Sequence, residues 1–121
     1  MQIPVIHPDP ALEYAFVEGC RILESWNHGD DPQASIARAR VAPGVTTRWH
    51  ALNGVTERYL IVEGSGRVEV GERAPERVQV GDVVVIPAGV RQRITNVGAG
   101  DLVFYAICTP RFTPACYAAL D

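Results

Sequence analysis

The chain has 121 residues and a formal net charge of -3 at pH 7, with 47% hydrophobic and 21% charged residues. This length and balance are typical of one globular domain that buries a core of its own. Nucleic-acid binding relies on clustered positive charge, so the composition predicts no nucleic-acid partner. All 11 basic residues are arginines, which excludes Schiff-base chemistry on a lysine.

The three cysteines, Cys20, Cys108 and Cys116, form an odd set without a CxxC spacing. We therefore expect no disulfide framework and a reduced, cytoplasmic protein. The first ten residues are too short and too rich in proline for a signal peptide. No apolar run approaches the length of a membrane span, so we expect no membrane partner.

In chain order, a short helical turn is predicted near Pro10, and a polar loop at 27–33 follows a first strand. The strand-like runs alternate apolar and polar residues or are rich in Val and Ile, and turn residues such as Asn53-Gly54 separate them. They cover 20–26, 35–41, 57–64, 66–72, 77–87, 91–97 and 101–110. This pattern predicts an all-β antiparallel sandwich or barrel. Thr113 as N-cap and Pro114 at the first helical position predict a short closing helix.

Two spaced sets of residues resemble the two motifs of the cupin superfamily. The first set is Gly44, His50, Glu57 and Gly64, and the second is Gly81, Pro87, Gly89 and Asn96. The resemblance implies a single cupin domain over 1–121, with motif one at 44–64 and motif two at 81–96. It implies a double-stranded β-helix, or jelly-roll barrel.

In that family, two histidines and a glutamate of motif one and a histidine of motif two bind a divalent metal. Here His50 and Glu57 match, Leu52 stands in place of the second histidine, and Gln92 stands in the motif-two position. The resemblance thus implies a reduced metal set of His50, Glu57 and Gln92, with Mn, Fe, Zn or Ni as the ion. The alternative is that these side chains satisfy one another by hydrogen bonds without a metal.

Further candidates come from the alternation of side chains along a strand. Tyr59 should share the face of Glu57, as a substrate-binding residue and a proton donor. Arg48 should share the face of His50 and could hold an anionic substrate. Arg38 and Arg40 alternate with small alanines; if the arginine face points inward, Arg40 would bind substrate.

Three functions are considered at this stage, and the sequence favours the first over the other two. The first is a metal-dependent enzyme of oxygenase, isomerase or lyase type acting on a small polar molecule, with His50 and Tyr59 as catalytic residues. The second is a metal-free, isomerase-like or cyclase-like enzyme with His50 as base, oriented by Glu57, and Tyr59 as acid. The third is a non-catalytic small-molecule-binding protein. Small cupins commonly pair, and the apolar segment 2–6 needs a partner, so we also expect a homodimer.

Overall fold

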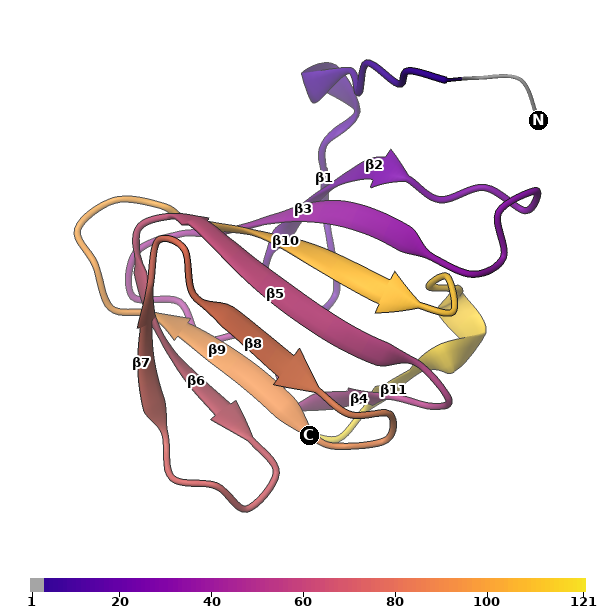
Figure 1. The fold of residues 1–121 in the computed structure, drawn as a ribbon. Helices are drawn as coiled ribbons and strands as arrows, with labels where there is room; N and C mark the ends of the chain where they lie inside the picture. Colours follow the sequence, from indigo (N-terminus) through magenta and orange to yellow (C-terminus); the bar gives the residue numbers. More distant parts are fainter. Residues whose placement is uncertain (1–3) are drawn as a thin grey trace.

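The computed structural model describes residues 4–121, which form two antiparallel β-sheets packed face to face (Figure 1). The six-stranded sheet has the order β1-β2-β3-β10-β5-β8, and the five-stranded sheet has the order β11-β4-β9-β6-β7. The prediction of an all-β jelly-roll barrel is confirmed. The strands of the first sheet are β1 (Tyr14–Ala15), β2 (Arg21–Trp26), β3 (Ser35–Val41), β5 (Thr56–Glu63), β8 (Val83–Ile86) and β10 (Leu102–Thr109). Those of the second are β4 (His50–Leu52), β6 (Ser65–Val70), β7 (Glu76–Gln79), β9 (Gln92–Asn96) and β11 (Tyr117–Ala119).

The core lies between the sheets because successive side chains of each strand point to opposite faces. Strand β10 shows this most clearly: Leu102, Phe104, Ala106 and Cys108 are buried, and the residues between them are partly exposed. Strand β9 buries Gln92, Ile94 and Asn96 in the same way. The inward face of β9 therefore brings two amides into the interior, where His50 and Glu57 are also buried.

Helix is confined to two short 3-10 segments, Pro10–Leu12 and Pro114–Cys116, among the residues that the structure describes. The first agrees with the turn predicted near Pro10. The predicted closing helix stops after Cys116, and Thr113 makes no side-chain cap. The residues that follow form β11, which pairs with β4 at the edge of the five-stranded sheet. Within residues 4–121, no helix is both long enough and apolar enough to cross a membrane.

Two residues of the family motifs, Gly64 and Asn96, have structural roles. Gly64 has a φ of 82°, and a Cβ built there would lie 2.5 Å from the carbonyl oxygen of Asp101, so only glycine fits. Asn96 Nδ2 donates to the carbonyl oxygens of Val41 and Gly100, both at 2.8 Å. These hydrogen bonds tie β9 to the end of β3 and to the loop before β10. They give Asn96 a structural role in the motif.

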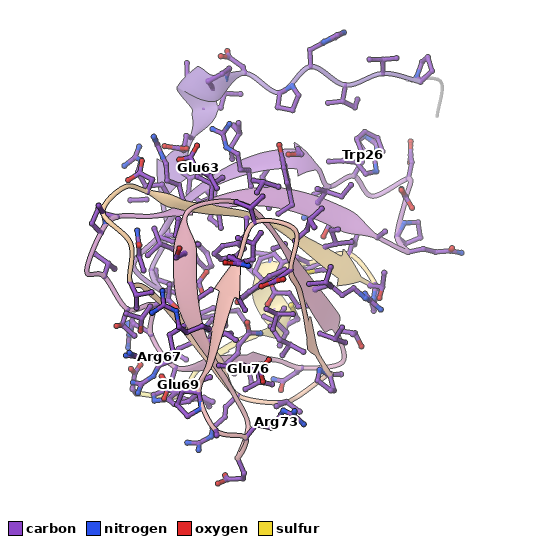
Figure 2. The ribbon with its side chains drawn as sticks, turned by 60° about the vertical axis from the view of Figure 1, so that its left-hand side comes forward. Trp26, Glu63, Arg67, Glu69, Arg73 and Glu76 are labelled. Atoms are coloured by element: carbon purple, nitrogen blue, oxygen red, sulfur yellow. The ribbon has the colours of Figure 1, made fainter. Side chains whose placement is uncertain are left out.

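The outer face of the five-stranded sheet is charged. Charged side chains of the β6–β7 hairpin, Arg67, Glu69, Arg73 and Glu76, lie at the end of the molecule opposite Trp26 (Figure 2). The guanidinium groups of Arg91 and Arg93 cover the ring of Trp49 at 4.5 and 4.3 Å from its centroid. This face is therefore suited to contact with water.

The outer face of the six-stranded sheet carries an apolar patch as well as the arginines of β3. Its exposed large hydrophobic side chains include Ile36, Leu60, Val62, Val83 and Val85. Leu60 lies opposite Val83 in the β5–β8 ladder, and β8 is the edge strand of this sheet. An exposed apolar face beside an open edge favours association.

We expect the protein to be a homodimer that pairs through this face. Light scattering coupled to size-exclusion chromatography should give twice the 13.2 kDa chain mass at micromolar concentration. Leu60→Glu combined with Val85→Glu should give the monomer, whereas Val80→Glu, at an exposed position between β7 and β8, should not. A wild-type mass of 13.2 kDa would contradict the prediction. Of the apolar segment that first suggested pairing, residues 2 and 3 lie outside the described residues, and Val5 and Ile6 are exposed.

Candidate active site

A cavity of about 50 Å³ lies against the inward face of the six-stranded sheet, beneath the segment that joins β1 to β2. An outer chamber of about 450 Å³ shares part of its wall, namely Tyr14, Phe16, Glu24 and Phe112. The inner wall is mostly apolar, with Glu18, Glu57 and Tyr59 among its polar members. A largely apolar pocket with a few convergent polar groups is the usual form of a small-molecule site.

Three side chains from the two sheets form a hydrogen-bonded chain across the core. Strand β5 supplies Glu57 and Tyr59, which share a face because they lie two residues apart. Gln92, on β9, accepts a hydrogen bond from the Tyr59 hydroxyl through Oε1. It donates from Nε2 to Glu57 Oε1 at 2.8 Å. Both ends of the amide are thus engaged, which fixes its orientation.

Burial raises the pKa of Glu57 from 4.5 to about 7, and the negative charge of Glu18 adds to this shift. The hydrogen bond from Gln92 and the charge of His50 oppose it. The thiol of Cys108, which pairs with Glu57 across the β5–β10 ladder, lies 3.8 Å from Oε2. Glu57 can therefore exchange a proton near neutral pH, the property that acid–base catalysis requires.

His50 is held by two oxygen atoms. Its Nδ1 lies 2.8 Å from the carbonyl oxygen of Arg48, and its Nε2 lies 3.0 Å from Glu18 Oε2. The ring stacks on Tyr117, with centroids 5.2 Å apart. The partner that orients His50 is thus Glu18, which corrects the prediction that Glu57 would do so.

The two oxygen neighbours favour the doubly protonated imidazole, because a carbonyl and a carboxylate can only accept. Burial lowers the pKa of His50, but the hydrogen bond and charge of Glu18 outweigh it and leave the pKa raised. His50 is therefore better described as an imidazolium paired with Glu18 than as a free general base.

The donor set does not fit a divalent metal centre. A metal needs a lone pair on the histidine, but Nε2 of His50 faces a carboxylate and favours a proton. The amide oxygen of Gln92 already accepts from Tyr59, and Leu52 packs in an apolar cluster with Val55, Cys108 and Cys116. Among residues 4–121, no group of three or more His, Cys, Asp or Glu side chains is placed to hold an ion.

The two predicted substrate-binding arginines do not line the cavity. Arg48 binds the C-terminal residue, with Nε 3.1 Å from Asp121 Oδ1, so its side chain lies outside the barrel. Arg40 lies on the outer face of β3 because the small side chains of Ala37 and Ala39 occupy the cavity wall. Only Tyr59 of the predicted substrate-binding set reaches the cavity.

Arg40 instead anchors the segment over the cavity. Together with Arg21 and Arg38 it binds the carboxylate of Glu13, just before β1. Hydrogen bonds from Arg21 and Arg40 lower the pKa of Glu13 to about 2. The arginine face of β3 therefore holds in place the chain that carries Tyr14, Phe16 and Glu18.

Sequence reasoning missed Glu18, which enters the cavity from the segment between β1 and β2. Its backbone carbonyl accepts from Arg48 N at 2.8 Å, and its Oε1 lies 3.1 Å from the thiol of Cys20. A loop residue belongs to no strand alternation, so periodicity could not assign its direction. The following Gly19, with a φ of 98°, was the one available sign of a tight turn there.

Comparison with known proteins identifies the family to which this chain belongs. The model of the cupin domain family matches residues 37–108, and the chain belongs to that family. No curated protein shows significant sequence similarity to it.

Several solved structures share the fold. A variant of Streptomyces PAC13 with uridine has a TM-score of 0.81 at 14% identity, covering 99% of this chain and 92% of that one. Another structure of Pac13, described as a unique nucleoside dehydratase, has a TM-score of 0.76 at 15% identity, covering 96% and 91%. KdgF from Halomonas sp. has a TM-score of 0.73 at 17% identity, covering 83% and 88%. At these identities the likeness extends to the fold alone.

Proposed function

We propose that this cupin is a metal-independent acid–base enzyme that eliminates water from a small hydroxylated carbonyl compound. The observation that carries the proposal is the pair of carboxyl groups that line one cavity. Burial and the negative charge of Glu18 raise the pKa of Glu57 to about 7, whereas Glu18 is paired with the imidazolium of His50. Two carboxyl groups in contrasting environments are the usual arrangement for an acid and a base in one site.

In the proposed reaction, the Glu18 carboxylate takes the proton from the carbon next to the carbonyl. The electron pair of that C–H bond forms the C=C bond, and the bond from the neighbouring carbon to its hydroxyl oxygen breaks. Glu57 gives its proton to the departing hydroxyl, which leaves as water. The proton taken by Glu18 returns to Glu57 through solvent, which restores both groups.

The remaining polar residues position these two groups. Gln92 holds Glu57 Oε1, and Tyr59 fixes Gln92. The pKa of Tyr59 is raised well above its ordinary value by burial and by the charge of Glu57, so its hydroxyl keeps its proton. His50 places a positive charge beside Glu18, with its Nε2 3.0 Å from Glu18 Oε2. The fold is compatible with this chemistry, since the structural neighbour Pac13 is described as a nucleoside dehydratase.

The test is turnover of a panel of small β-hydroxy aldehydes and ketones, followed by the ultraviolet absorbance of the conjugated product. We expect kcat/KM to fall as the pH rises through about 7, because Glu57 must be protonated to act as the acid. Glu57→Gln should lower kcat by about 10²-fold or more. Glu72→Gln, at a 95% exposed side chain on the far hairpin, is the matched control and should be unchanged.

Chelation with EDTA should leave the rate unchanged. A rate that disappears with EDTA and returns with an added divalent ion would overturn the metal-independent mechanism. If no compound of the panel reacts, the proposal of an enzyme fails and a binding function replaces it.

A further inference from the structure

The charges around the cavity are unequal in number. Three acidic side chains line the inner wall, namely Glu18, Glu24 and Glu57, and one basic side chain, His50, contacts Glu18. Among the described lining residues of this inner cavity, none is an arginine. Arg111 reaches only the outer chamber, where its Nε donates to Asn27 Oδ1 at 2.7 Å. Since His50 contacts Glu18, the carboxylate of Glu24 is left without a basic partner in a partly desolvated site.

Aromatic rings surround the entrance. Phe16 lies at their centre, with ring centroids 6.4 Å from Tyr14, 6.3 Å from Phe112 and 5.3 Å from Tyr117. All four rings line the outer chamber. Aromatic rings attract a cation through the negative potential of their faces and also cover its apolar substituents.

One buried polar atom at the site has no hydrogen bond within the described chain. It is the hydroxyl of Tyr117, which lines the outer chamber. Glu18 lines the inner cavity, and its Oε2 has a charged partner in Nε2 of His50 at 3.0 Å. Buried polar atoms normally have partners, so the unpaired hydroxyl at a cavity points to a ligand that supplies one.

We propose that this cavity selects a compact organic cation, an ammonium group with apolar substituents, held by Glu18 and Glu24 and enclosed by the aromatic rings of the entrance. The inference rests on the proposed function in one respect: the cation would be part of the substrate. An anion would be repelled by the carboxylate of Glu24, which has no basic partner among the described lining residues. A neutral polyol could donate hydrogen bonds to a carboxylate but would gain no attraction between opposite charges. The oxygens of Tyr59 and Ser35 already take part in hydrogen bonds, with Gln92 and with the backbone N–H of Phe112.

Three compounds of nearly equal shape test the role of charge: choline, the neutral 3,3-dimethylbutan-1-ol and the anionic 3,3-dimethylbutanoate. Dissociation constants are measured by calorimetry and by protein NMR shifts at about pH 8 and about pH 6. We expect choline to bind at least about tenfold more tightly than the alcohol, and the anion not to bind. Choline should bind more weakly at the lower pH, because Glu57 is protonated there.

Variants separate this inference from the proposed function. Glu24→Gln should reduce the preference for choline over the alcohol, and the exposed control Glu72→Gln should preserve it. Equal affinity for choline and the alcohol, tighter binding of the anion, or no binding of any compound at millimolar concentration would overturn the inference. A protein that prefers choline but turns over no hydroxy carbonyl compound would refute the enzyme proposal alone. If the protein turns over a hydroxy carbonyl compound but binds the alcohol more tightly than choline, only the inference of cation selectivity is refuted.

Discussion

Glu57→Gln should raise the free energy of unfolding by about 3 kcal/mol at about pH 8, although it removes the proposed catalytic acid. In the folded protein, burial and the charge of Glu18 raise the pKa of Glu57 from 4.5 to about 7. That difference corresponds to about 3 kcal/mol lost when the carboxylate ionises inside the fold. Glutamine has the same shape and no charge, and its amide oxygen can still accept from Gln92.

The sign of the effect follows from proton binding. Between about pH 4.5 and 7 the folded protein holds a proton on Glu57 that the unfolded chain releases, so wild-type stability falls as the pH rises through this range. The gain from Glu57→Gln should accordingly shrink towards zero at about pH 4.5. Urea unfolding of both proteins at several pH values measures it, with Glu72→Gln as the exposed control. A variant that is less stable than wild type at pH 8 would show that Glu57 is not a destabilised buried carboxylate.

His50→Gln should lower the free energy of unfolding by about 3–5 kcal/mol below neutral pH, because it leaves the carboxylate of Glu18 without its charged partner. The His50 side chain is 3% exposed and that of Glu18 is 13% exposed, so solvent screens the pair weakly. The double variant Glu18→Gln/His50→Gln should lose less than the two single variants together.

The pH dependence of this pair arises from a charge that the fold stabilises, whereas that of Glu57 arises from a charge that the fold destabilises. Although burial opposes it, the contact with Glu18 leaves the pKa of His50 raised, so its contribution is fully present below about 6.5 and is lost as the pH rises through the folded value. The cost of His50→Gln should therefore be smaller in alkaline solution. Thermal or urea unfolding in acid and in alkali gives the comparison. Additive losses in the double variant would contradict the pairing of His50 with Glu18.

Much of the fold could be predicted because it depends on local spacing. Alternation along a strand places Glu57 beside Tyr59, and Gln92 beside Asn96, on the inward faces. The motif spacing located the strands that carry them. The closing helix was predicted too long, because the edge of β4 offers Tyr117–Ala119 backbone partners that sequence alone does not reveal.

The site was less predictable than the fold because its contacts join distant segments. Glu18 reaches His50 from a loop 32 positions earlier in the chain, and no alternation marks that approach. The choice between the alanine and arginine faces of β3 depends on tertiary contacts: Ala37 and Ala39 line the cavity, and Arg38 and Arg40 bind Glu13 on the outer side. A family motif transfers the position of His50 reliably, but the partner of its Nε2 decides whether it can bind a metal.

The titration of the Glu57 carboxyl carbon by NMR, on protein labelled with ¹³C at glutamate Cδ, tests the central claim most directly. Comparison with Glu57→Gln identifies the resonance, and the titration is repeated with excess Zn²⁺ and with EDTA. We predict a midpoint at about 7 that neither addition changes. A midpoint near the ordinary glutamate value of 4.5, or one that Zn²⁺ lowers while His50 loses its proton, would contradict a metal-independent acid at this position.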